Sequence, residues 1–150
     1  MRGWLQVAVL GVAPVMLACA FGLPPQMGRC DSGGLESPLP RDDFVGRYSY
    51  RATASSASST LELVAEKHGD RFVVVGFNEF GVKAFSVTRL AGVTTVERHL
   101  GPLLRIPPEN VVDDLFGAQF LEGMPVGSVV RVEHPSCRYQ ARVKLLSRTP

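Results

Sequence analysis

Few side chains in this sequence have the type and spacing that catalysis or metal binding requires. His134 and Cys137 form one H-x-x-C pair, but no second pair of histidines or cysteines accompanies it, as a zinc site would need. Asp113 and Asp114 are adjacent on an expected helix, so we expect them to be solvated or to interact with the helix dipole. No G-x-S-x-G elbow and no glycine-rich phosphate loop is present. We therefore predict no enzyme activity, no metal and no cofactor.

The N-terminus carries the clearest chemical signal, a cysteine at the end of an uncharged stretch. Arg2 precedes an uncharged run over residues 3–20, which is the layout of a signal peptide. Val15–Cys19 fits a loose bacterial lipobox, in which the Cys19 thiol takes a diacylglycerol and cleavage removes residues 1–18. A multiply acylated cysteine anchors a protein stably in a membrane. We therefore predict a lipoprotein-type signal peptide and lipidation of Cys19.

Two other fates remain open for this segment. Ala18 and Ala20 also fit an A-x-A cleavage site after Ala20, which would release a soluble periplasmic or secreted protein. The stretch would otherwise stay as an uncleaved membrane anchor, although Gly11 and Pro14 interrupt the apolar run that a spanning helix needs. Because Ala20 is not aspartate, resemblance to known lipoproteins implies sorting to the outer membrane, on the periplasmic face of the bacterial cell envelope.

The other two cysteines form an even pair. Once Cys19 is acylated or removed, Cys30 and Cys137 remain in an oxidising compartment, which predicts a disulfide between them. The bridge would close a loop of about 107 residues, for which chain entropy gives about 4–5 kcal/mol of stabilisation. The alternative is two free thiols.

Length and composition are those of one globular domain with a removable segment. The chain has 150 residues, of which 45% are hydrophobic and 20% are charged, and these values exclude a disordered chain. The formal net charge is only +2, so no strong field selects nucleic acid. Residues 19–42 are rich in proline and glycine, and we expect a flexible tether there, with the folded domain over residues 43–150.

Within the domain, apolar and polar residues alternate with the period of β-strands. Short turns join consecutive segments, which predicts an antiparallel meander. We expect strands over 44–54, 59–67, 71–77, 82–90, 93–100, 128–135 and 138–147. A helix is expected over about 109–120, because Pro108 stands at its start and Gly123 follows its end. The predicted fold class is mainly β (α+β): a strongly curved antiparallel sheet or incomplete β-barrel with this helix packed over it.

One stripe of the expected helix is apolar and consists of Val112, Leu115, Phe116 and Phe120. On the concave side of a curved sheet, such a stripe is either the lid of a ligand cavity or a solidly packed part of the core. We name these four residues as candidate cavity and lid residues, and the sequence leaves both interpretations open.

The stretch over residues 73–116 resembles the core of uncharacterised bacterial lipoproteins related to the lipoprotein receptor LolB. The shared features are an apolar strand that ends in glycine, a short loop with Gly81, an alternating strand with Phe85, and a later helix led by Pro-Glu. RYQARVKLL over 138–146 resembles their closing strand. The chain departs from them at Ala91–Gly92, where they often have Asp-Gly, and it has fewer strands than the full carriers.

This resemblance implies an incomplete β-barrel closed by helices over a hydrophobic cavity that holds acyl chains, with the helix over 109–120 as part of the lid. We therefore expect a membrane-anchored lipoprotein that binds or transfers a lipid-like or acyl ligand in the cell envelope. The alternative is a structural or accessory envelope lipoprotein with a solidly packed β core and no ligand. The expected partners are the membrane, through Cys19, and a lipid or acylated ligand, whereas nucleic acid is not expected.

Overall fold

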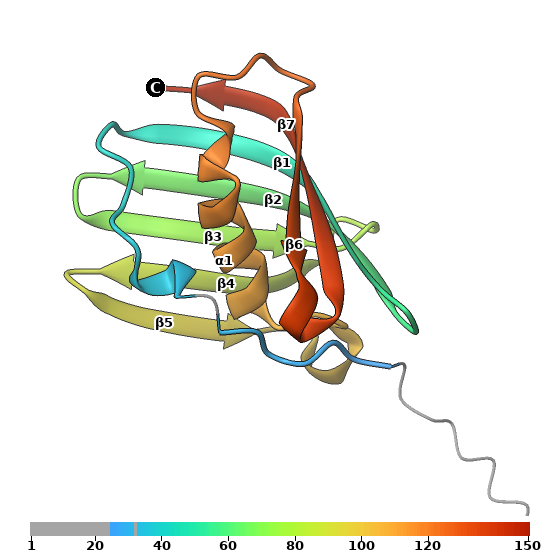
Figure 1. Ribbon diagram of the computed structural model, residues 1–150. Coiled ribbons are helices and arrows are strands. Elements are labelled where there is room, and N and C mark those ends of the chain that lie inside the picture. The colour runs from blue at the N-terminus through green and yellow to red at the C-terminus, as the bar shows by residue number, and fades with distance from the viewer. Residues whose placement is uncertain (1–24, 32) are drawn as a thin grey trace, which may run out of the picture.

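The computed structural model describes residues 25–31 and 33–150, and in this part of the chain seven strands form one antiparallel sheet (Figure 1). The strands are β1 (Phe44–Ala54), β2 (Ser58–His68), β3 (Arg71–Phe77), β4 (Lys83–Leu90), β5 (Val93–Arg98), β6 (Val129–His134) and β7 (Tyr139–Thr149). The other elements are the helix α1 (Pro108–Gly117) and the 3-10 turns η1 (Gly34–Glu36), η2 (Gly101–Leu103), η3 (Gln119–Leu121) and η4 (Pro135–Cys137). The predicted fold class is confirmed.

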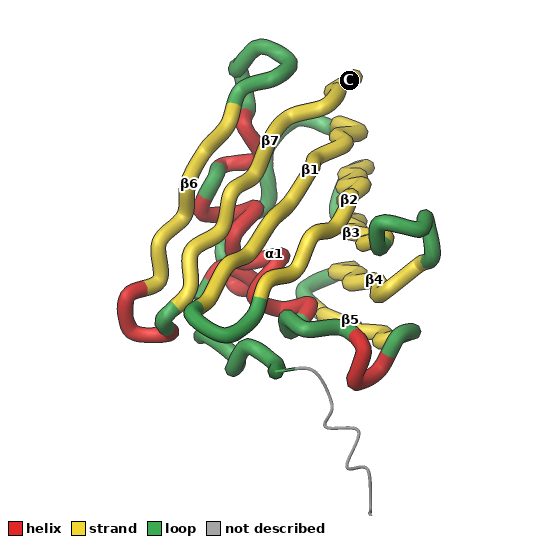
Figure 2. The backbone as a smooth tube through the Cα atoms, turned by 90° about the vertical axis from the view of Figure 1, so that its right-hand side faces the viewer, coloured by secondary structure: helices red, strands yellow, loops and turns green. Residues whose placement is uncertain are grey.

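The sheet curls around α1 without closing (Figure 2). Its strand order is β5-β4-β3-β2-β1-β7-β6, so β5 and β6 are its two edges. Between these edges the chain crosses the concave face through η2, α1 and η3, and α1 lies against that face (Figure 1). A β-bulge between Arg47 and Tyr48, where β1 pairs with β7, adds to the bend. The fold is therefore a half-barrel with a helix in its hollow.

Alternation along each strand decides which side chains face α1. In β1, Phe44, Gly46, Tyr48, Tyr50 and Ala52 are buried, whereas the residues that alternate with them are partly or fully exposed. The β2–β3 hairpin turns at Gly69, whose φ of 58° costs glycine little because it has no Cβ. The period-2 pattern of the sequence thus places the apolar side chains of neighbouring strands on one concave surface.

The helix is shorter than the sequence suggested. It begins at Pro108, as the position of proline predicts, but it ends at Gly117. The next turn, η3, has positive φ values of 50° at Gln119, 53° at Phe120 and 48° at Leu121, so its backbone is left-handed. This left-handed turn brings Phe120 back onto the core beside α1, where it is buried.

The segment that we expected to be a flexible tether is packed on the domain over residues 25–31 and 33–42. The Met27 amide donates a hydrogen bond of 2.8 Å to the Arg105 carbonyl, and the Cys30 amide donates one of 2.8 Å to Asn110 Oδ1 of α1. Met27 and Cys30 are both buried. Local composition indicated an irregular segment correctly, but it could not show that α1 offers polar side chains to bind it.

Candidate functional site

The four candidate lid residues fill the space between α1, η3 and the concave face. Val112 and Leu115 are fully buried, Phe120 is 3% exposed, and Phe116 is partly buried. The Phe116 ring meets the rings of Phe72 and Phe120 edge-on, at centroid distances of 5.7 and 4.9 Å. Close packing of this kind places protein atoms where a carrier would hold its ligand. The arrangement is that of a core helix.

A groove of about 410 Å³ lies instead at one end of the sheet, and we call it the end groove. It is formed by the start of β2, the β3–β4 loop and the chain from η2 towards α1. Its lining residues are Ser58, Ser59, Thr60, Leu61, Asn78, Glu79, Phe80, Leu100, Leu103, Leu104 and Arg105. Phe80 is 81% exposed and Leu103 is 65% exposed, so two large apolar side chains face solvent at this groove. Apolar side chains exposed around a hollow surface indicate a binding site.

The β3–β4 loop that presents Phe80 is held by its own hydrogen bonds. Asn78 Oδ1 accepts bonds from the amides of Phe80 and Val82, at 3.0 and 2.9 Å. The Asn78 amide in turn donates to the Val82 carbonyl, and Gly81 adopts a φ of 74°. An asparagine that binds the backbone two residues further on favours a tight turn. The exposed position of Phe80 therefore follows from an ordered loop.

The N-terminal segment runs past the same end of the sheet. Gln26 Nε2 donates a hydrogen bond of 2.8 Å to the Pro102 carbonyl in η2, directly beside Leu103. Met27 binds Arg105, another residue of the end groove. Figure 1 shows residues 25–31 at the end of the half-barrel that also carries η2 and the start of α1. Residues 26 and 27 therefore lie close to the end groove.

A second site surrounds Asp114, which the sequence led us to expect either in solvent or as a partner of the helix dipole. A position in solvent is wrong, because Asp114 is fully buried. Its carboxylate accepts hydrogen bonds from Tyr50 Oη at 2.7 Å, from Tyr139 Oη at 3.2 Å and from His134 Nε2. We call Tyr50, Asp114, His134 and Tyr139 the carboxylate cluster. Asp113 is also buried, and its Oδ1 accepts a bond of 2.8 Å from the Leu35 amide.

Burial is the largest influence on the pKa values of Asp114 and of the two tyrosines in this cluster. It raises the pKa of Asp114, while the hydrogen bonds from Tyr50, His134 and Tyr139 act in the opposite direction. Burial, followed by the charge of Asp114, raises the pKa of Tyr50 and of Tyr139 well above the usual phenol value. Tyr48 lies outside the cluster, and burial raises its pKa to about 12. All three tyrosines of the chain are therefore neutral donors at physiological pH.

The predicted disulfide between Cys30 and Cys137 is confirmed, with its two Cα atoms 5.7 Å apart. It joins the N-terminal segment to η4, the bend between β6 and β7. Cys30 is 5% exposed, whereas Cys137 is partly exposed. The Cys30 sulfur lies 3.7 Å from His134 Nδ1, so the disulfide adjoins the carboxylate cluster.

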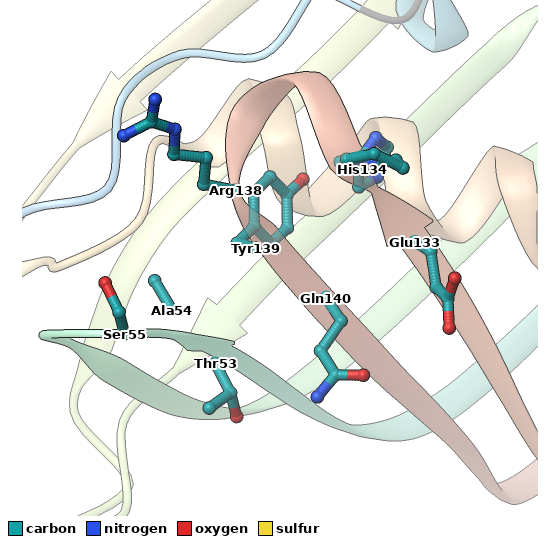
Figure 3. Close-up of a pocket in the computed structure, with 9 residues that line it drawn as sticks. Thr53, Ala54, Ser55, Glu133, His134, Arg138, Tyr139 and Gln140 are labelled. Atoms are coloured by element: carbon teal, nitrogen blue, oxygen red, sulfur yellow. The ribbon is translucent and has the colours of Figure 1, made fainter.

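A surface pocket of about 430 Å³, which we call the bend pocket, opens beside this cluster (Figure 3). The end of β1 lines one side of it, and the β6–β7 bend lines the other. Its residues are Thr53, Ala54, Ser55, Glu133, His134, Pro135, Arg138, Tyr139 and Gln140. The His134 ring stacks on the Tyr139 ring at a centroid distance of 4.7 Å. Solvent thus approaches the edge of a cluster whose carboxylate is buried.

Sequence reasoning missed the end groove and the carboxylate cluster. Phe80 had a local signal, because a phenylalanine between Glu79 and Gly81 in a polar turn is poorly placed for burial. Asp114 had no such signal, since its partners Tyr50 and His134 lie 64 and 20 positions away in the chain.

The predicted lipidation residue, Cys19, lies outside the described residues. Among the residues that the structure does describe, no helix is long and apolar enough to cross a membrane, and no group of three or more His, Cys, Asp or Glu side chains is arranged to hold a metal ion. The chain matches no family model, and no curated protein matches it in sequence. Its function must therefore be argued from its own side chains.

Proposed function

We propose that the chain is a membrane-anchored lipoprotein of the cell envelope that binds a lipid-like or acyl ligand in the end groove. The observation that supports this proposal is the pair of exposed apolar side chains, Phe80 and Leu103, at a groove of about 410 Å³. This volume falls within the range of small-molecule sites, about 300–1,000 Å³. In this proposal the end groove is the ligand site, in place of the apolar stripe of the helix that the sequence had offered as the candidate.

The lining of the end groove suits an amphiphile. Leu61, Leu100 and Leu104 provide apolar walls, and Phe80 and Leu103 provide apolar rims. Hydroxyl groups from the start of β2 and the charged side chains of Glu79 and Arg105 lie at the same groove. An acyl chain would contact the apolar walls, while its polar head would stay beside these polar groups.

The position of the anchor also supports a membrane-facing groove. If Cys19 is acylated, five residues separate it from Pro25, so six Cα–Cα steps join the two. Even when fully extended, six steps span at most about 22 Å, at roughly 3.3–3.6 Å per residue. Gln26 and Met27 are bound to the backbone of Pro102 and Arg105, so this short connection starts at the groove. The anchor would therefore keep the end groove close to the bilayer surface.

A second candidate function is favoured by a different observation. The concave face is filled by α1 and η3, with Val112, Leu115 and Phe120 buried against the sheet. This packing suits an accessory envelope lipoprotein that holds no ligand. The two functions differ in one measurable property, which is affinity for an acyl ligand in the absence of detergent.

The test combines native mass spectrometry of detergent-free protein with titration of a fluorescent sixteen-carbon fatty acid. Burial of one large apolar side chain contributes about 1.5–3 kcal/mol. Leu103→Ser should therefore weaken fatty-acid affinity by roughly tenfold or more, at about 1.4 kcal/mol per tenfold. Val126→Ser is the matched control, because Val126 is 67% exposed but lies on the loop before β6. That variant should bind like the wild type.

Each alternative gives a distinct result. Absence of co-purified lipid together with absence of fatty-acid binding by the wild type would support the accessory function. Binding that is indifferent to Leu103 but weakened by Phe116→Ala would return the site to the helix. Membrane attachment is tested separately by Cys19→Ala, which should move the protein from the membrane fraction to the soluble fraction.

A further inference from the structure

The disulfide and the carboxylate cluster together contain a three-residue array. The Nε2–H of His134 donates to Asp114 Oδ1, and His134 Nδ1 lies 3.7 Å from Cys30 Sγ. A sulfur, an imidazole and a carboxylate in this sequence of contacts resemble the arrangement that activates a thiol. The imidazole takes the thiol proton, and the carboxylate orients the resulting imidazolium. In this protein the sulfur is held in a disulfide with Cys137.

We propose that Cys30–Cys137 is a reactive disulfide that exchanges with external thiols, with Cys137 as the attacked sulfur and Cys30 as the leaving group. The inference does not depend on the function proposed for the end groove. Two observations support it. The sulfur of Cys30 lies against His134, and Cys30 is more deeply buried than Cys137. The chemical class of the reactant is a low-molecular-weight thiol or a protein dithiol.

Accessibility selects the attacked sulfur. Cys30 is 5% exposed, and its amide is held by Asn110, so an external thiol meets little of its surface. Cys137 is partly exposed at the end of η4, with the Ser136 hydroxyl 3.7 Å from its sulfur. Arg138, the next residue, lines the bend pocket, and its positive charge attracts an approaching thiolate.

The exchange balances in two steps. First, the thiolate of one external thiol attacks Cys137 Sγ, the disulfide breaks, and its electron pair leaves on Cys30 Sγ, which gives a mixed disulfide on Cys137. A second external thiolate then attacks the external sulfur of this mixed disulfide and releases the Cys137 thiolate. The two external thiols leave as their own disulfide. Two electrons and two protons have passed from them to the protein cysteines.

His134 favours the first step because it stabilises the leaving group. Thiols beside a protonated histidine have pKa values of roughly 3.5–7.5, compared with about 8.5 for a free cysteine, and a leaving thiol of lower pKa departs faster. His134 meets Cys30 through Nδ1 and Asp114 of α1 through Nε2. Tyr139 of β7 stacks on its ring.

The other charged and titratable groups near the ring come from β1, β6, β7, α1 and the residue after η4. Tyr50 of β1 and Tyr139 are neutral and donate to Asp114. Glu133 and Arg138 line the adjoining bend pocket and carry opposite charges. Asp113 of α1 is close enough to raise the pKa of Tyr139 through its charge. Asp114 is thus the anion in hydrogen-bond contact with the ring, and it acts as a positioning residue for His134.

The first test measures reduction of the full-length protein by glutathione and maps the mixed disulfide by peptide mass spectrometry. Glutathione should be found on Cys137. His134→Gln should react about tenfold more slowly and shift the redox equilibrium tenfold, or about 30 mV, towards a more negative potential. His99→Gln is the matched control, since His99 is an exposed histidine on the loop after β5, and it should behave like the wild type. Glutathione on Cys30, or equal rates for both variants, would overturn the proposal.

The second test is independent of whether His134→Gln folds. In a Cys137→Ser variant, the pH profile of Cys30 alkylation should give a pKa below about 7.5, and the added change Asp114→Asn should raise it. A Cys30 pKa of about 8.5 or above in Cys137→Ser would refute the array. Leu115→Ala tests whether reduction requires unfolding: a rate that rises in proportion to the unfolded population would also refute exchange in the native state.

Discussion

Replacement of Cys30 and Cys137 with serine should destabilise the domain strongly. The bridge closes a loop with a sequence separation of 107, which contains α1 and all of the described strands except β7. The chain-entropy expression, −2.1 − 1.5R ln n cal/mol/K, gives about 4.8 kcal/mol at 25 °C for a loop of this length. The native geometry changes little in the variant, because Asn110 still binds the backbone at position 30. We therefore expect most of the loss to arise in the unfolded chain.

Reduction of the wild type should cost less than this replacement. If His134 stabilises the reduced native protein tenfold, that stabilisation corresponds to about 1.4 kcal/mol. The free energy of unfolding should then fall by about 3.4 kcal/mol on reduction, compared with about 4.8 kcal/mol in the double serine variant. The comparison therefore separates the general effect of a long-loop bridge from the specific effect of the histidine beside it.

Urea denaturation followed by circular dichroism measures both quantities. The m-value should also rise in the serine variant, because an unfolded chain without the bridge exposes more surface. A loss below about 2 kcal/mol would refute the loop-entropy reasoning and show that the reduced chain keeps structure around the bridge site. Equal losses on reduction and on replacement would refute the stabilised thiolate instead.

Three further predictions concern the packing of the half-barrel. Burial raises the pKa of every tyrosine, so the stability that their neutral forms provide is complete below pH 10. This stability is lost as the pH rises towards 12, by up to about 1.4 kcal/mol per pH unit for each tyrosine. Tyrosinate absorbance should therefore appear only as the circular dichroism signal of the fold disappears. Gly76→Ala should cost about 1–3 kcal/mol in urea denaturation, because the new Cβ would lie 2.3 Å from Phe85 Cε1, whereas Gly28→Ala, with open space around it, should cost little. Gln119→Gly should stabilise the protein by about 0.5–1 kcal/mol in the same assay, because glycine relieves the strain of a φ of 50°; a loss of stability would show that the Gln119 side chain makes a needed contact.

The sheet and the disulfide could be predicted because their signals are local or arithmetical. Alternation of apolar and polar residues is a property of each strand alone, and turns such as that at Gly69 have a steric cause. The Cys30–Cys137 pair followed from the count that remains after Cys19 is set aside. None of these inferences needed knowledge of how distant segments meet.

The contacts of the polar face of α1 could not be predicted, because they depend on how distant segments of the chain meet. Its pattern of one apolar stripe beside Asp113 and Asp114 is that of a helix with one side in water. In the structure the sheet curls around the helix and the N-terminal segment covers another side, so both carboxylates are buried and bound. Their partners come from β1, β6, β7 and residue 35, and only the assembled half-barrel brings these together.

These contacts make α1 the element that joins the two proposed sites. Asn110 holds the segment that carries Cys30, and Asp114 orients the histidine beside the disulfide. Asn110 Nδ2 also donates to the Gly28 carbonyl, so cleavage of the disulfide leaves this segment bound to the helix. Thiol exchange at Cys137 therefore need not displace residues 25–27 from the end groove. Fatty-acid binding should accordingly be the same in oxidised and reduced protein, and a change in affinity on reduction would show that the bridge, and not α1, positions the groove.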